Sequence, residues 1–375
     1  MTVPIASRRL ASVYDQPGPF VTVYLDASRD TEQGTQEVTL RWRDVRDELA
    51  REGADAATLD AIEPALSEDA GRGGRHGLVA VAANGQLLFA DHLPQPPARS
   101  AGVLAPLPHL LPYLAQHATA ETHVVVLADR TGADLLLVPA TGEPEGETVH
   151  GGTSYPMHRT ATADWSERHF QLRVENTWEA NAKDVAAAVG RMVAQHAAKL
   201  VVIAGDVRAR HLIADALGAT PGVDVRLVEE GGRAAGSSAE TLHRAVQDEV
   251  LRHAWRQRRE LLEHLQQNLG RHEYAVAGVP DVVRALRKAQ ADTVILSDDP
   301  SSTLTAWVGP RATDFGLDDA EAADLGVTAP EHDRFDAALV RAVLGTGARL
   351  AVTPGAHDYL PDGIGALLRY DDAAT

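Results

Sequence analysis

The chain has 375 residues, enough for two or three domains that each bury a core. Its formal net charge of -18 excludes a nucleic-acid or membrane surface that covers the whole protein, so any contact with nucleic acid must be local. The absence of cysteine excludes disulfides, thiolate metal ligands and a cysteine nucleophile, and is typical of a reducing cytoplasm. No apolar run reaches the roughly 20 residues of a membrane span, and no secretory signal is evident, so we expect a cytoplasmic protein with no membrane partner.

The first segment, residues 1–118, alternates predicted strands and helices. Residues 19–27 predict a strand and residues 37–53 a helix. Two apolar runs flank Asn84 and Gly85, a dipeptide typical of a two-residue hairpin turn. A proline-rich break and an apolar stretch follow, and we place the first domain boundary at their end.

The second segment, residues 119–239, opens with another hairpin, whose turn is predicted at Asp129–Gly132. A polar stretch without hydrophobic periodicity covers residues 142–165. A helix is predicted over residues 183–200, with a core-facing stripe made of Val185, Val189, Met192 and Val193. Strand, helix and strand follow at 199–206, 208–217 and 223–230. This alternation predicts an α/β layer fold.

The third segment, residues 240–375, begins with a long charged helix predicted over 238–270. Helix and strand then alternate to the end of the chain, which predicts a third α/β domain. The long helix carries an arginine grouping: Arg252, Arg256, Arg258 and Arg259. Two interpretations remain open for it. One is a local nucleic-acid contact, and the other is a solvated helix face balanced by Glu260 and Glu263.

The motifs of common enzymes are absent from the sequence. The glycine-rich stretches at 71–77 and 231–236 lack the spacing of a phosphate loop or a dinucleotide fingerprint. The 16 histidines include no HExxH motif, and the adjacent pairs at 332–333 and 357–358 have diverging side chains. No GxSxG elbow occurs. We therefore expect no catalytic residue of these classes, no metal and no cofactor.

The end of the chain carries the clearest resemblance to a known family. Residues 279–299 and the closing strand, loop and glycine-rich turn are similar to the C-terminal domain of archaeo-eukaryotic release factors and Pelota-type rescue factors. The matching residues of the turn are Gly363, Ile364, Gly365, Ala366, Leu367, Leu368, Arg369 and Tyr370. The chain most resembles the bacterial members, including the Balon-type ribosome hibernation factors and their actinobacterial relatives. The resemblance implies a three-domain α/β architecture with an RNase H-like middle domain and an L7Ae-like C-terminal domain.

The resemblance also locates a tip loop at residues 150–170. In the release factors this loop carries Gly-Gly-Gln, which falls here on Ala163, Asp164 and Trp165. A carboxylate and an indole cannot replace the glycine backbone and the amide that position water, so we expect no peptidyl-tRNA hydrolysis. A displaced tip at 151–153, or Gln171 as a displaced amide, lacks the required spacing. The cysteine-containing codon-reading motif of the eukaryotic factors is also absent.

We expect the tip to contact rRNA through aromatic stacking and phosphate contacts. Trp165, placed before the helix, is the stacking candidate. The full set is Tyr155, His158, Arg159, Ala163, Asp164, Trp165, Ser166, Arg168, His169 and Arg173. Phe170 and Trp178 stand eight residues apart, so they share a helix face and are expected in the core rather than at the contact.

These observations favour a ribosome-binding factor of the hibernation or rescue type, which occupies the A site as a tRNA mimic without hydrolysis. Its partners would be the 70S ribosome, through rRNA of the A site and the peptidyl-transferase region, and elongation factor Tu or another translational GTPase. One alternative is a peptidyl-tRNA hydrolase with a rebuilt tip. Another is a stress-related scaffold that binds only a translational GTPase.

Overall fold

The computed structural model describes residues 9–30, 33–129, 131–140, 145–150, 165–229, 239–299, 302–326, 329–353 and 359–371. The chain forms two compact units. Residues 1–118 and 258–375 together make a discontinuous unit, and residues 119–257 make the central unit. The sequence predicted three domains over other ranges, and those three ranges remain a prediction.

The N-terminal part of the discontinuous unit is a four-stranded antiparallel sheet in the order β3-β2-β1-β4. Its strands are β1 (Phe20–Asp26), β2 (Gly77–Ala83), β3 (Gln86–Leu93) and β4 (Ala101–Ala105). The predicted hairpin is present between β2 and β3. Asn84 and Gly85 have φ values of 52° and 74°, the left-handed pair that its turn requires.

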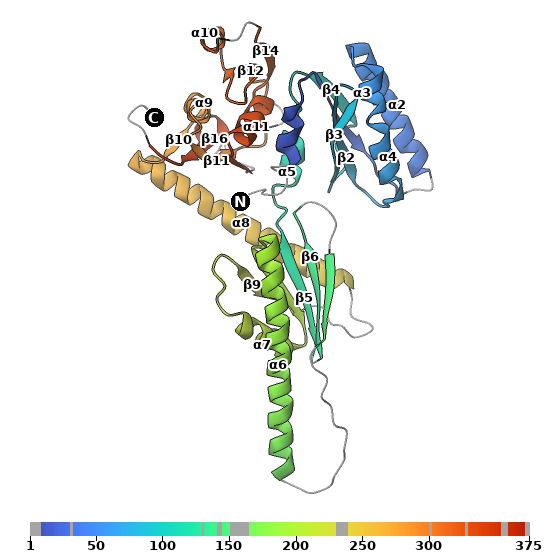
Figure 1. Cartoon of the computed structure of the whole chain (residues 1–375), viewed down its shortest axis with the longest axis vertical. Helices are drawn as coiled ribbons and strands as arrows, with labels where there is room; N and C mark the ends of the chain where they lie inside the picture. Colours follow the sequence, from blue (N-terminus) through green and yellow to red (C-terminus); the bar gives the residue numbers. More distant parts are fainter. Residues whose placement is uncertain are drawn as a thin grey trace. The chain divides into compact units, whose positions relative to one another are not determined.

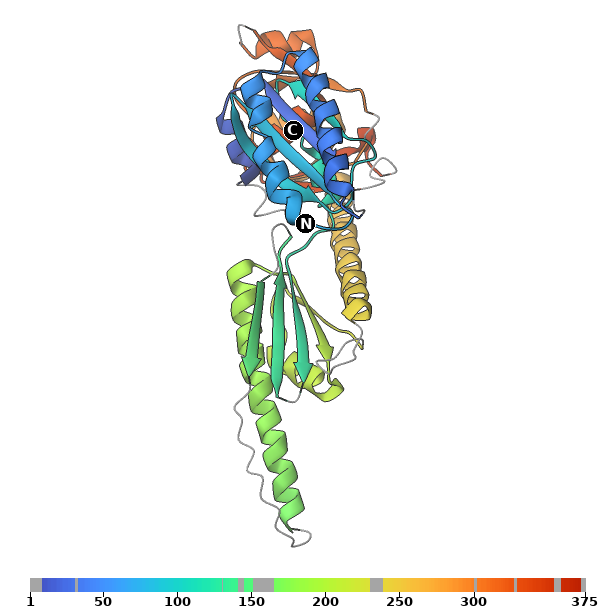
Figure 2. The same ribbon diagram turned by 90° about the vertical axis from the view of Figure 1, so that its right-hand side faces the viewer.

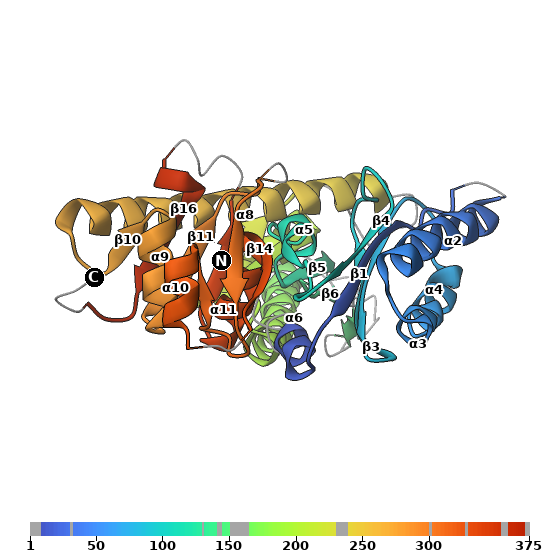
Figure 3. The same cartoon turned by 90° about the horizontal axis from the view of Figure 1, so that it is seen from above.

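Helices cover one face of this sheet (Figure 3). They are α2 (Gly34–Glu52), α3 (Ala56–Asp60) and α4 (Glu63–Glu68). The α2 side chains Val38, Trp42, Val45 and Leu49 are buried, a spacing that places them on one helix face. They pack against Val21, Val23 and Leu25 of β1, which alternate along the strand and therefore lie on the sheet face that the helices cover.

The C-terminal part contains two sheets. The larger has the order β10-β16-β11-β15, and a smaller one has the order β13-β12-β14. The strands are β10 (Ala275–Ala277), β11 (Ala291–Leu296), β12 (Thr305–Val308), β13 (Phe315–Gly316), β14 (Glu331–Arg334), β15 (Arg349–Val352) and β16 (Ile364–Leu368). The helices include α9 (Val279–Arg287), α10 (Asp319–Asp324) and α11 (Phe335–Gly345). The predicted helix–strand alternation is present, and the small sheet is an additional element that the alternation did not indicate.

One hydrophobic core joins the two parts of the discontinuous unit. Phe20, Val79 and Phe89 of the N-terminal sheet belong to the same buried cluster as Leu339 and Val343 of α11. Contributions also come from η1 (Ser12–Asp15) and α5 (Leu111–Gln116). Residues from opposite ends of the chain therefore fold as one body.

The central unit is a five-stranded mixed sheet in the order β7-β6-β5-β8-β9. Its strands are β5 (His123–Asp129), β6 (Gly132–Val138), β7 (Glu145–His150), β8 (Leu200–Gly205) and β9 (Asp224–Leu227). The first three form an antiparallel meander, and β8 and β9 continue it in parallel. The predicted hairpin at Asp129–Gly132 is confirmed, whereas β7 falls in the polar stretch for which no strand was expected.

Helices lie on both faces of the central sheet (Figures 1 and 2). On one face, α6 (Trp165–His196) and α7 (Val207–Leu217) cover Val124, Val126 and Ile203. On the other, Val246 and Val250 of α8 (Ala239–Arg271) pack on residues that include Val125 and Val202. The alternation of Val124, Val125 and Val126 between the two faces explains why this strand is apolar throughout. The predicted α/β class is confirmed.

Within the described ranges, no helix combines the length and the apolar character needed to cross a membrane.

Candidate functional site

The predicted tip residues lie at the start of α6 or just before it. Tyr155, His158, Arg159, Ala163 and Asp164 fall outside the described residues. Five others belong to the first turns of α6, where the structure describes the backbone and not the side chains: Trp165, Ser166, Arg168, His169 and Arg173. The rRNA contact therefore stays a prediction. One detail is corrected: Trp165 begins α6 rather than preceding it, and the helix starts well before residue 183.

Helix α6 is the element that positions this end of the central unit. Its 32 residues correspond to about 48 Å of helix, roughly twice the length of the seven-residue strand β5. The predicted stripe is confirmed in the second half, where Val185, Val189 and Val193 are buried and Met192 is partly buried. The first half extends beyond the end of the sheet (Figures 1 and 2). Because only the second half packs on the sheet, the first turns project from the unit.

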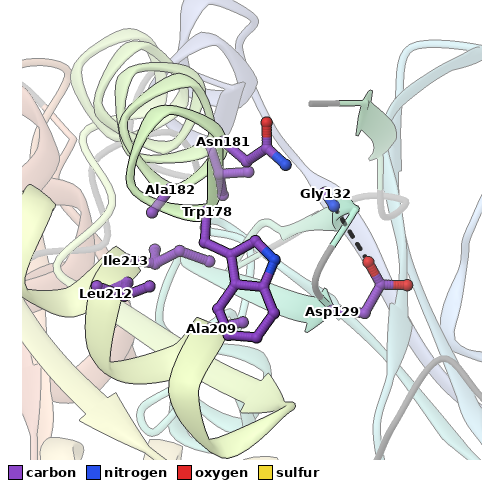
Figure 4. A pocket seen from close by; sticks show the side chains of 9 residues that line it. Asp129, Gly132, Trp178, Asn181, Ala182, Ala209, Leu212 and Ile213 are labelled. Atoms are coloured by element: carbon purple, nitrogen blue, oxygen red, sulfur yellow. Dashed lines mark hydrogen bonds between the residues drawn. The ribbon is translucent and has the colours of Figure 1, made fainter. Parts of the chain in front are cut away.

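A small pocket lies beside α6 near the point where the helix leaves the sheet (Figure 4). Its walls come from α6, α7 and the β5–β6 turn, and its lining residues are Asp129, Gly132, Trp178, Asn181, Ala182, Val185, Ala209, Leu212 and Ile213. Half-buried Trp178 forms one wall, and the guanidinium carbon of Arg208 lies 4.7 Å from its ring centroid. The tryptophan thus braces α6 against α7.

The carboxylate of Asp129 at the rim of this pocket serves the hairpin turn. Its Oδ1 accepts hydrogen bonds from the backbone N–H groups of Thr131 and Gly132, at 2.7 and 3.1 Å, and from the Thr131 hydroxyl. An oxygen that accepts three turn hydrogen bonds is held as a structural acceptor rather than as a base. The pocket therefore fits a role in holding α6.

A buried charge cluster connects α8 to the edge of the central sheet. The Nε2 atom of His253 lies 3.0 Å from Glu121 Oε2, and its Nδ1 lies 3.2 Å from Asp224 Oδ2. The neighbouring Glu121 carboxylate raises the pKa of His253 above its usual value, Asp224 adds to this, and burial opposes it. Arg256 approaches the same Asp224 oxygen at 2.7 Å.

The arginine grouping on α8 does not form an uncompensated basic patch. Arg252 pairs with Glu249 at 2.7 Å, and Arg259 lies 3.7 Å from Glu263. Arg256 belongs to the cluster around Asp224, and Arg258 is buried. These pairs favour the balanced helix face over a nucleic-acid contact.

A cluster that the sequence analysis missed lies in the N-terminal sheet, where Asp69, His76 and His92 converge. They stand 7 and 16 residues apart on three different elements, so no short motif indicates them. Only the pairing of β2 with β3, which sets His92 opposite Leu78, brings them together.

Sequence comparison identifies a family model and two relatives to which the chain is similar. Residues 122–271 match the bacterial archaeo-eukaryotic release factor family 2. Over 371 residues, 98% of this chain and 97% of the relative, the sequence is 29% identical to an uncharacterized protein of Mycobacterium tuberculosis H37Rv, and the same values hold for its counterpart in strain CDC 1551.

Several solved structures show a weaker similarity. Archaeal Pelota, in a model of its ribosome-bound form with ABCE1, is 12% identical at a TM-score of 0.41, covering 98% of this chain and 94% of that one. S. cerevisiae Dom34 is 10% identical at a TM-score of 0.40, with the same coverage. Archaeoglobus fulgidus Pelota is 12% identical at a TM-score of 0.36, covering 96% and 92%.

The match over residues 122–271 agrees with the release-factor resemblance expected from the sequence. The matched range contains the whole of α6. The α/β fold class is confirmed by the strands, helices and sheets of the structure, and the three-domain release-factor-like architecture stays a prediction. The RNase H-like and L7Ae-like assignments of individual domains stay predictions.

Proposed function

We propose that the protein is a cytoplasmic, ribosome-associated translation factor of the hibernation or rescue type, which occupies the A site as a tRNA mimic without peptidyl-tRNA hydrolysis. The observation that carries the proposal is the release-factor family match over residues 122–271, with Ala163, Asp164 and Trp165 where the catalytic Gly-Gly-Gln is expected. The family match supports ribosome association, and the altered tripeptide supports the loss of hydrolysis.

The geometry of α6 supports a contact role for its first turns. A helix that is braced at Trp178, and whose inward face is buried between Ala182 and Val193, presents its other end as a rigid extension. Arginines on such an extension suit phosphate contacts, and an indole suits stacking on an unpaired base. The overall charge of -18 makes a local contact of this kind necessary, because the remaining surface repels RNA.

Sedimentation with purified 70S ribosomes tests the proposal. The full chain is expected to pellet with ribosomes at modest salt. Arg168→Ala combined with Arg173→Ala is expected to weaken binding by tenfold or more and to reduce its salt dependence, because two phosphate contacts are lost. Arg191→Ala is the matched control, since Arg191 is an exposed arginine in the half of α6 that packs on the sheet.

Three results discriminate among the alternatives. A chain that stays at the top of the gradient contradicts ribosome association. Release of peptide from loaded ribosomes contradicts the non-hydrolytic role and favours the rebuilt-tip hydrolase. Capture of elongation factor Tu or another translational GTPase without rRNA favours the protein-only scaffold, whereas capture together with ribosomes fits a delivery partner of the proposed factor.

A further inference from the structure

The buried carboxylate of Asp69 is the centre of the missed cluster. Asp69 opens the short η2 helix (Asp69–Gly71), His76 directly precedes β2, and His92 lies in β3. Asp69 Oδ1 lies 3.0 Å from His76 Nε2 and 3.1 Å from His92 Nδ1. One ligand atom from each residue falls within 4.8 Å of the others. Two imidazole nitrogens thus converge on one carboxylate oxygen.

The backbone holds His76 in the orientation that a metal ligand needs. Its Nδ1 lies 3.2 Å from the carbonyl oxygen of Gly74 and donates a proton to it. In the neutral ring this tautomer leaves a lone pair on Nε2, directed at Asp69. Two acceptors then face each other at 3.0 Å, an arrangement that needs a positive species between them.

His92 supplies an independent observation. Its Nδ1 atom is buried, and no group in the described part of the chain makes a hydrogen bond with it, although Asp69 Oδ1 is 3.1 Å away. A buried nitrogen that lies 3.1 Å from a carboxylate oxygen and has no hydrogen-bond partner among the described residues is a polar group that a bound ion could satisfy.

The groups around the cluster hold Asp69 in place and leave the cluster open to solvent on one side. The second oxygen of Asp69 pairs with Arg29 Nη1, so the carboxylate is fixed from behind, as ligating carboxylates usually are. The side chain of His92 is 37% exposed, which leaves a route from solvent to the site. Bonds of about 2.0–2.2 Å to a tetrahedral ion set ligand atoms about 3.3–3.6 Å apart, so the observed separations of 3.0 and 3.1 Å need to widen by a few tenths of an ångström.

We propose that Asp69, His76 and His92 bind one divalent transition-metal ion of the zinc class, with the fourth position open to water. Two imidazoles and one carboxylate, without thiolate, suit such an ion better than the hard cations Mg²⁺ and Ca²⁺, which prefer oxygen ligands. The ion joins both ends of the 69–76 loop to β3. That loop carries Arg72 and Arg75, so metal binding fixes the base of a two-arginine loop.

The test uses the full chain, freed of metal by EDTA and dialysis and then titrated with ZnCl₂ by calorimetry and with CoCl₂ by visible absorption. We expect one equivalent to bind with micromolar or tighter affinity, and the Co²⁺ form to show the intense absorption of tetrahedral coordination. His92→Ala is expected to weaken binding at least tenfold. His211→Ala, which removes an exposed histidine of the central unit, is expected to leave it unchanged.

X-ray absorption of the zinc-loaded wild-type chain gives a second readout that does not depend on the folding of a variant. Two imidazoles in a four-coordinate N/O shell support the site. A shell without imidazole, no stoichiometric binding, or binding that His92→Ala leaves intact would overturn it. The cluster would then be a hydrogen-bonded His–Asp–Arg network that takes a proton instead of an ion.

Discussion

Asp333 of β14 and His109, which precedes α5, are 224 positions apart in the chain, yet His109 Nε2 lies 2.8 Å from Asp333 Oδ1. The other carboxylate oxygen accepts the backbone N–H of Leu107 at 2.8 Å. The same buried side chain therefore holds two neighbouring points of the N-terminal part to the small C-terminal sheet. This polar connection lies beside the shared apolar core and explains how the two chain ends fold as one unit.

Replacing Asp333 by alanine is expected to destabilise the discontinuous unit by about 1–3 kcal/mol, because the buried N–H of Leu107 loses its acceptor. Urea unfolding of the full chain, followed by circular dichroism, measures the change. Asp324→Ala removes an exposed carboxylate from the same part of the chain and is expected to stay within about 0.5 kcal/mol of wild type. Equal effects of the two substitutions would contradict the role assigned to Asp333.

Elements specified by nearby residues were predictable from the sequence. The turns at Asn84–Gly85 and Asp129–Gly132 depend on local backbone chemistry, and the Val185, Val189 and Val193 stripe depends on helical periodicity. Strand β7 was not predictable in this way. It is an edge strand that pairs only with β6, and its exposed Glu145 and Glu147 leave no apolar alternation to detect.

Sites built across elements were the hardest to foresee. The convergence of Asp69, His76 and His92 depends on the β2–β3 register, which spacing along the chain does not reveal. The contact between Asp333 and His109 depends on tertiary packing alone. Trp178 lies between these two cases. Helical spacing predicted that it packs inward, and the side chain does line the pocket. Its half-buried position beside Arg208, however, depends on the approach of α7.

The brace at Trp178 predicts that α6 loosens when the indole is removed. Trp178→Ala is expected to lower stability by about 1–3 kcal/mol, less than for a fully buried tryptophan, because the ring is only half-buried. Hydrogen exchange should quicken at the α6 amides around Ala182 and Val185. Trp178→Phe keeps an aromatic ring in the pocket and should retain most of the protection. Unchanged exchange in the alanine variant would show that the pocket does not anchor the helix.

The raised pKa of His253 makes the stability of the central unit depend on pH. The folded state binds the proton more tightly than the unfolded state, so the stabilisation is fully present below the unfolded pKa of about 6.5 and is lost as pH rises through the folded pKa. We expect the difference in unfolding free energy between wild type and His253→Gln to fall as pH increases from about 5.5 to 8.5. Urea titrations across this range measure it.

The comparison of wild type with His253→Gln is needed because other groups change the unfolding free energy in the opposite direction as pH rises. Burial lowers the pKa of His123, so this residue favours the folded state more as pH rises. The charges that face His253 are Glu121 and Asp224, and Arg226 and Arg256 pair with the same Asp224 oxygen that His253 approaches. A difference that stays constant or grows with pH would show that Glu121 and Asp224 do not hold the proton on His253.

Rebuilding the catalytic tripeptide tests the proposed loss of hydrolysis directly. In the variant Ala163→Gly, Asp164→Gly and Trp165→Gln, the backbone at the start of α6 gains the freedom of glycine, and an amide replaces the indole. We expect wild type to release no peptide from loaded ribosomes above background, and the triple variant to release it at least tenfold faster than wild type. A single well-placed donor is worth about 10²–10³ in rate, so even a partly aligned amide should be detectable.

The matched control is Gly151→Ala with Gly152→Ala, which removes the other glycine pair of the tip segment while leaving 163–165 intact. If wild type hydrolyses peptidyl-tRNA through a displaced tip, this control loses the activity, and the non-hydrolytic role is contradicted. If the triple variant still sediments with ribosomes but releases no peptide, residues 163–165 do not occupy the position of the catalytic tripeptide. Release by the triple variant alone supports both the proposed register and the proposed loss of catalysis, because only the chemistry of the tip was changed.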